Sequence, residues 1–110
     1  MLDAEQKKIA LQELGGLSEE IYDGIVRDFV AQTRSQITQL ESLLAAGDLN
    51  AAARICHAIK GSSGNLRIKA VYEIIRNMEE AARAGQSAGL DESAGRVQGL
   101  IEELGVQFGV

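Results

Sequence analysis

Apolar residues recur along this chain at spacings of three and four, which is the period of an amphipathic α-helix. The longest such stretch opens after Ser18, whose hydroxyl can cap a helix, and it ends at Gly47. The acidic residues that follow Ser18 suit the positive end of a helix dipole. Its apolar stripe predicts one buried face, formed by Ile21, Ile25, Phe29, Thr33, Ile37, Leu40 and Leu44.

Three more stretches with this period follow, and a shorter one comes first. Short connections of two to four residues would make consecutive long helices antiparallel neighbours. The sequence therefore predicts an all-α fold, an antiparallel up-down four-helix bundle with a short extra N-terminal helix, in a single domain over residues 1–110. The additional helices are expected at about 2–14 with Asp3 as cap and Gly15-Gly16 as end, at 48–65 with Asp48 as cap, at 67–85 and at 87–108.

A second set of apolar residues lies beside the main stripe of the long helix, namely Tyr22, Val26 and Val30. We expect them to pack against the short first helix or to form part of a partner-docking patch. Dimerisation through these residues stays open.

Composition narrows the class of protein. The 110 residues carry a net charge of −5 and include no proline, and a negative balance argues against nucleic acid as the main partner. No stretch approaches the roughly 18 apolar residues of a membrane span, and the N-terminus lacks a signal-peptide pattern. The lone cysteine, Cys56, cannot form an internal disulfide, so we expect a cytoplasmic protein in which Cys56 is a small buried hydrophobe.

Charge is unevenly distributed within this acidic chain. The segment from Leu49 to Tyr72 contains no Asp or Glu, and the only histidine, His57, lies within it. At 100° per residue, His57 faces away from the apolar arc of its helix and should point into water. A local basic patch around an exposed imidazole suits a small anionic group such as phosphate. The cations of this patch are Arg54, Lys60, Arg67 and Lys69.

Neutral imidazole is a good nucleophile toward phosphorus. Arg54 and Lys60, one turn before and after His57, disfavour a charged ring and can hold phosphoryl oxygens after transfer. A glycine inside a helix costs up to about 1 kcal/mol relative to alanine, so we interpret Gly61 as bare surface for the close approach of another protein. Gly64 fits that role as well, or that of the residue that ends the helix.

The segment His57-Ala58-Ile59-Lys60-Gly61-Ser62-Ser63-Gly64-Asn65-Leu66 resembles the signature of histidine phosphotransfer (HPt) domains of two-component phosphorelays. The resemblance extends to Leu14-Gly15-Gly16, Phe29, Gly47-Asp48 and the segment from Met78 to Gly85.

The resemblance implies a four-helix bundle in which His57, through Nε2, takes a phosphoryl group from a receiver-domain aspartate and passes it to another receiver. It implies Lys60 as the phosphate-side cation, and Gly61 and Gly64 as close-approach positions. The implied partners are response-regulator receiver domains and a hybrid sensor kinase, and the protein would be a monomeric carrier with no ATP site and no cofactor of its own. Magnesium belongs to the receiver in this family.

One residue departs from the family pattern. Members commonly carry glycine directly after the Asn-Leu pair, whereas this chain has Arg67. Its charge is unfavourable at the start of the next helix. We interpret Arg67, together with Arg54, as a docking contact for an acidic receiver surface, with neutral drift at Arg67 as the alternative.

Three other functions remain as alternatives. The first is an interaction module of the same fold that binds receivers without transferring phosphate. A metal site is disfavoured because the sequence offers no second histidine and no nearby carboxylate. Hydrolysis is disfavoured because Ser62 and Ser63 point toward or beside the core, and no carboxylate is placed to orient His57.

Overall fold

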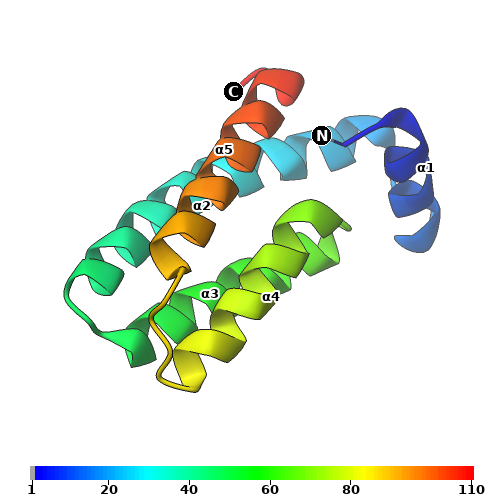
Figure 1. Ribbon diagram of the computed structural model, residues 1–110. Coiled ribbons are helices and arrows are strands. Elements are labelled where there is room, and N and C mark those ends of the chain that lie inside the picture. Colours follow the sequence, from blue (N-terminus) through cyan, green and yellow to red (C-terminus); the bar gives the residue numbers. More distant parts are fainter. Residues whose placement is uncertain (1) are drawn as a thin grey trace.

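The structure is a computed structural model that describes residues 2–110, and it confirms the predicted helical fold. α3 packs between α2 and α4, and α5 closes the ring between α4 and α2 (Figure 1). Consecutive long helices run antiparallel, which makes an up-down four-helix bundle preceded by one short helix. The helices are α1 (Ala4–Glu13), α2 (Glu19–Ala45), α3 (Leu49–Asn65), α4 (Lys69–Arg83) and α5 (Leu90–Phe108).

Helix starts follow the local sequence closely. The side chains of Asp3, Ser18 and Asp48 each accept a hydrogen bond from the backbone N–H three residues ahead, so α1, α2 and α3 begin where the caps predict. α4 and α5 begin later than expected. Arg67 (φ 61°) lies before α4 and Gly89 (φ 79°) lies before α5, and both have a left-handed backbone. A right-handed helix cannot include such a residue, so each helix begins after it.

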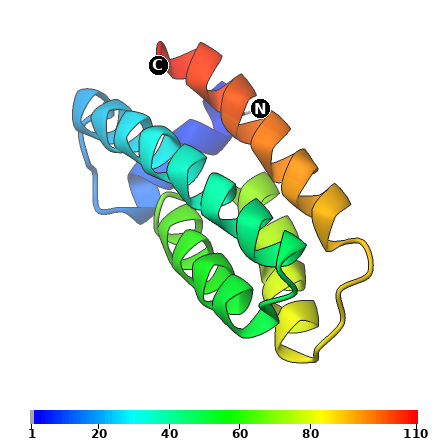
Figure 2. The same cartoon turned by 90° about the vertical axis from the view of Figure 1, so that its left-hand side faces the viewer.

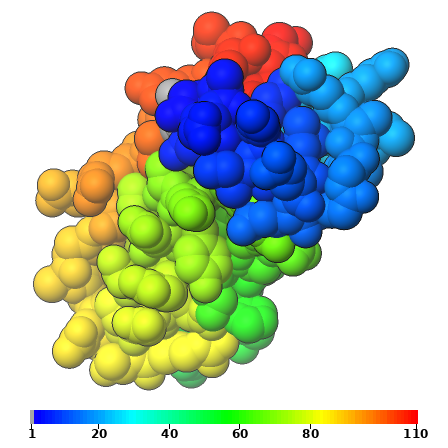
Figure 3. Space-filling view, turned by 90° about the vertical axis from the view of Figure 1, so that its right-hand side faces the viewer, coloured from blue at the N-terminus to red at the C-terminus, as the bar shows by residue number. Residues whose placement is uncertain are grey.

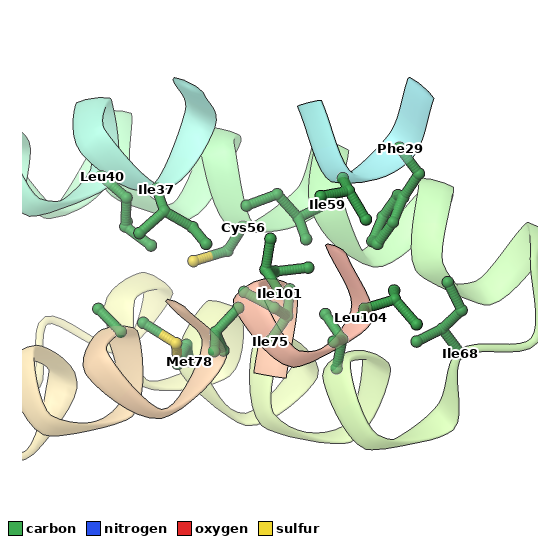
Figure 4. Close-up of a cluster of buried hydrophobic side chains, with 14 of the residues drawn as sticks. Phe29, Ile37, Leu40, Cys56, Ile59, Ile68, Ile75, Met78, Ile101 and Leu104 are labelled. Atoms are coloured by element: carbon green, nitrogen blue, oxygen red, sulfur yellow. The ribbon is translucent and has the colours of Figure 1, made fainter. Parts of the chain in front are cut away.

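The core is aliphatic and runs the length of the bundle. Cys56 lies within it, 1% exposed, and burial raises the pKa of its thiol to about 11, with a smaller contribution from the charge of Glu79. Its role as a small buried hydrophobe is confirmed. Figure 4 shows a cluster of core side chains, among them Phe29, Ile37, Leu40, Ile59, Ile68, Ile75, Met78, Ile101 and Leu104.

The expected buried stripe of α2 is wrong at its N-terminal end. Ile21 and Ile25 are 56% and 41% exposed, whereas Tyr22 and Val26 are fully buried. Seven residues return a helix to within about 20° of the same face, but eight displace a side chain by about 80°. Tyr22 is therefore in line with Phe29, and Ile21 is not.

The second apolar set of α2, for which docking of a partner or dimerisation was considered, is thus part of the core. Tyr22, Val26 and Val30 are each 0% exposed, and the Tyr22 hydroxyl donates a hydrogen bond of 2.7 Å to the carbonyl of Leu66, where α3 ends. They cannot form a surface for a second copy of the chain without unfolding of the bundle.

α1 lies across the end of the bundle, near the start of α4 and the end of α5 (Figure 3). Lys7 forms ion pairs with Glu19 at 2.9 Å and Asp23 at 2.7 Å on α2. The carboxylate of Glu13 accepts a hydrogen bond of 2.9 Å from Arg67. Charged contacts therefore attach α1 to the rest of the fold.

Within residues 2–110, none of the helices combines the length and the apolar character that crossing a bilayer demands.

Candidate functional site

His57 lies near the middle of α3, on the side that faces solvent. Its neighbours Cys56 and Ile59 point into the core and are 1% and 0% exposed, whereas 65% of the His57 side chain is exposed. α3 itself lies at the outside of the bundle next to α2 (Figure 2). The predicted outward direction of the imidazole is confirmed.

A buried carboxylate on α4 lies beside the imidazole. Glu79 is 4% exposed, and its Oε2 lies 3.0 Å from Nδ1 of His57. Its Oε1 is 2.7 Å from Nζ of Lys60. Oε2 also accepts hydrogen bonds from Nε and Nη2 of Arg83, at 3.0 Å and 2.7 Å. We call these four residues the Glu79 cluster; it joins α3 to α4 through one charge-paired group.

The Glu79 cluster determines which nitrogen of the imidazole carries the proton. Burial opposes ionisation of Glu79, but contacts with Lys60, Arg83 and His57 outweigh it and lower the pKa of Glu79 to about 2. The carboxylate is ionised at neutral pH and can only accept hydrogen bonds. Nδ1 of His57 therefore donates, and Nε2 keeps a free lone pair on the other side of the ring.

The expectation that no carboxylate lies near His57, on which a metal site and hydrolysis were disfavoured, is wrong. A signal was present in α4, where Glu79 follows Met78 and shares its apolar stripe with Ile75. A charged residue on a buried stripe needs partners. Arg83, four residues further on, is a partner that helix spacing provides. No spacing in the sequence indicates that Glu79 also pairs with His57 and Lys60 on α3.

Both hydroxyls near the histidine are engaged within α3. Ser62 and Ser63 each donate a hydrogen bond to the carbonyl four residues earlier, at 3.1 Å and 2.8 Å. Neither hydroxyl is bonded to His57, so Glu79 and His57 do not continue into a hydrolytic triad.

In the described part of the chain, no group of three His, Cys, Asp or Glu side chains could hold a metal ion.

The two glycines of the motif have different surroundings. A Cβ added at Gly61 would meet no atom within 4 Å, so the surface one turn from His57 is open. A Cβ at Gly64 would lie 3.3 Å from the ring of Tyr72 on α4. Gly64 lies inside the last turn of α3, and its interpretation as the residue that ends the helix is wrong. Arg67 has the left-handed backbone that ends it.

The two arginines proposed for docking also differ. Arg54 is exposed on the outer face of α3. The guanidinium of Arg67 donates to the carbonyls of Gly64 and Asn65, at 2.9 Å and 3.3 Å, and to Glu13. It thus caps the C-terminus of α3, where the helix dipole favours a cation. The unfavourable effect of Arg67 expected at the start of α4 is therefore accompanied by a favourable one at the end of α3.

The comparison with known protein families agrees with this geometry. A family model described as Hpt domain matches residues 24–107, which contain the whole Glu79 cluster. No match was found among curated protein sequences or among solved structures. The matched segment covers well over half of the chain, and the protein therefore belongs to the Hpt domain family, whose members carry out histidine phosphotransfer in two-component relays and interact with receiver domains.

Proposed function

We propose that Nε2 of His57 accepts a phosphoryl group from the aspartyl phosphate of one receiver domain and passes it to the aspartate of a second. The observation that carries this proposal is the contact between Nδ1 of His57 and the ionised Glu79. Because that contact keeps the proton on Nδ1, the nucleophilic lone pair is on Nε2, in an imidazole whose side chain is largely exposed.

The transfer step follows from these positions. The Nε2 lone pair attacks phosphorus, the P–O bond to the aspartate breaks, and the carboxylate leaves with the electron pair. The ring, still carrying its Nδ1 proton, becomes a cation that Glu79 stabilises. In the second transfer a carboxylate oxygen of the next receiver attacks phosphorus, and the electrons of the N–P bond return to Nε2.

Lys60 holds the phosphoryl oxygens in this proposal. Its side chain is 29% exposed and is paired with Oε1 of Glu79. A doubly charged phosphoryl group on His57 competes for that ammonium, while Arg83 remains on Oε2 of Glu79. The cluster therefore contains one cation for the carboxylate and one for the phosphate.

The remaining assignments complete the proposal. Gly61 and Gly64 are close-approach positions for the partner's backbone, and the missing Cβ of Gly64 also admits the close packing of Tyr72. Arg54 and Arg67 contribute cations to docking. Residues 1–110 act as one cytoplasmic, monomeric domain that carries phosphate without ATP-dependent kinase activity of its own. Its partners are response-regulator receiver domains and a hybrid sensor kinase.

The test is phosphoryl transfer from a panel of phosphorylated receiver domains to the wild type and to His57→Gln. We expect acid-labile, base-stable label on the wild type alone. The variant should melt close to the wild type, because the replaced side chain is mainly exposed. Label on both proteins would move the acceptor away from His57. Binding of a receiver without label would favour the non-transferring interaction module.

A further inference from the structure

Arg83 on α4 is joined to the site through Glu79. Its Nε and Nη2 donate to Oε2 of Glu79 at 3.0 Å and 2.7 Å, and within residues 2–110 Arg83 makes its side-chain hydrogen bonds to this oxygen only. The Arg83 side chain is 58% exposed, whereas that of Glu79 is 6% exposed. Arg83 therefore covers the buried carboxylate from the solvent side, and its replacement would leave no cavity in the core.

The oxygen that Arg83 holds is the one that contacts the imidazole. Nδ1 of His57 lies 3.0 Å from the same Oε2, so three N–H groups share this oxygen, while Oε1 is paired with Lys60. A carboxylate oxygen offers about two lone pairs, so each donor weakens the hold of the oxygen on the others. Arg83 thus competes with His57 for Oε2.

A carboxylate beside an imidazole works against a nucleophile. It favours the ring that is protonated on both nitrogens, and such a ring has no lone pair to offer to phosphorus. Around His57, two cations of the Glu79 cluster, Lys60 and Arg83, oppose this effect of Glu79, and Arg54 lies exposed one turn away on α3. Without Arg83, a single cation in the cluster would balance the carboxylate.

α2, the other helix packed against α3, adds little charge near the ring. The α2 residues that line the two grooves beside α3 are uncharged except for Asp28, which lies at the end of α3 with Ser62 and Asn65. Asn65 is eight residues beyond His57, which is about 12 Å along a helix. Groups on α3 and α4 therefore control the charge of the imidazole.

We propose that Arg83 is a positioning residue of the transfer site, which acts through Glu79 to keep Nε2 of His57 free of a proton. This inference rests on the proposed function and adds Arg83 to the residues that control it. Arg83 takes up part of the hydrogen-bonding capacity of Oε2 and offsets part of its charge. Glu79 then holds the proton on Nδ1 but does not charge the ring before the phosphoryl group arrives.

The only histidine of the chain makes this effect measurable without a partner. The ring nitrogens of His57 are followed by NMR as the pH is lowered, in the wild type, in Arg83→Gln and in the matched control Arg76→Gln, whose arginine is exposed two turns earlier on α4. We expect the ring of Arg83→Gln to take up its second proton at a pH about half a unit higher than the wild type. Arg76→Gln should titrate as the wild type does, and so should Arg83→Lys, which keeps a cation four residues from Glu79.

A double variant tests whether Glu79 transmits the effect. In the Glu79→Gln background, the addition of Arg83→Gln should change the titration of His57 much less than it does in the wild type, because Oε2 is then no longer charged. A shift of the same size in both backgrounds would mean that Arg83 acts on the ring directly, and it would overturn the proposal. A titration of Arg83→Gln equal to that of Arg76→Gln would overturn it as well.

Phosphoryl transfer gives the functional readout. With a receiver that labels the wild type, the plateau rate of Arg83→Gln relative to the wild type should be about threefold lower near about pH 6 and equal near about pH 8.5. The half-saturating receiver concentration should not change. An increase in that concentration with an unshifted titration would make Arg83 a docking contact and reject the proposal. A shifted titration in a protein that takes label from no receiver supports the action of Arg83 on the ring and rejects the proposed function alone.

Discussion

At the scale of the residue, the site depends on one buried carboxylate with three partners. Glu79 is 4% exposed, yet its pKa is lowered to about 2 because Lys60, Arg83 and His57 outweigh the cost of its burial. Its charge holds the proton of the imidazole on Nδ1 and balances the cations of the cluster. The same contacts thus contribute both to stability and to the proposed chemistry.

Glu79→Gln should reveal this charge through the pH dependence of stability. The pKa of Glu79 in the fold is below its usual 4.5, so its contribution is present at neutral pH and is lost as the pH falls from about 4.5 through 2. We expect the variant to be about 2 kcal/mol less stable than the wild type at pH 7. The difference should shrink through this range and vanish only below pH 2, where glutamate is protonated and neutral like glutamine. Urea denaturation at several pH values measures it, and a gap independent of pH would contradict the ionised cluster.

Gly61→Ala separates stability from function. A Cβ at this position meets open space, and alanine favours a helix over glycine by about 1 kcal/mol. The variant should therefore unfold at higher urea concentration than the wild type. It should also need more receiver for half-maximal transfer, because the Cβ stands where the partner approaches. Unaltered transfer would remove Gly61 from the docking face.

At the scale of the element, the end of α3 combines a strained residue with a capping side chain. Arg67 has a φ of 61°, a backbone conformation that favours glycine, and the N–H groups of Arg67 and Ile68 bond back to Gly64 and Ser63. The guanidinium of Arg67 offsets part of this strain through its contacts with the end of α3 and with Glu13.

Two substitutions at this position distinguish the backbone from the side chain. Arg67→Ala and Arg67→Gly both lose the guanidinium contacts, but only glycine adopts a left-handed backbone without strain. We expect Arg67→Gly to be about 1 kcal/mol more stable than Arg67→Ala by chemical denaturation. Equal stability of the two variants would mean that the backbone at residue 67 rearranges once the side chain is gone.

At the scale of the whole molecule, α1 is attached to the bundle differently from the other helices. Within α1 itself, Ala10 is the buried residue. Lys7 bridges Glu19 and Asp23, and hydrogen bonds to these carboxylates raise its pKa. Because α1 fully buries only Ala10 and packs Leu11 only partly against the core, it should open more readily than the long helices of the bundle.

Lys7→Ala should therefore loosen α1 alone. We expect faster amide hydrogen exchange over residues 4–13 and unchanged exchange in the centres of α2 to α5. The wild type in about 1 M salt should show the same trend to a smaller extent, because salt screens partly buried ion pairs less than exposed ones. If exchange increased throughout the bundle, α1 would be part of the cooperative core.

The sequence by itself determined the five helices, the caps of α1, α2 and α3, the outward direction of His57 and the bare surface at Gly61. These features depend on residues within one or two turns of each other, where helical period and capping are sufficient. The seven-residue spacing of Tyr22 and Phe29 is also in the sequence, although the stripe expected for α2 began at Ile21. Only the tertiary structure decided that Arg67 caps α3. It also brought Glu79 to His57 from a different helix. The pairing of a buried charge with side chains of another helix is set by packing between elements distant in sequence, which local patterns do not encode.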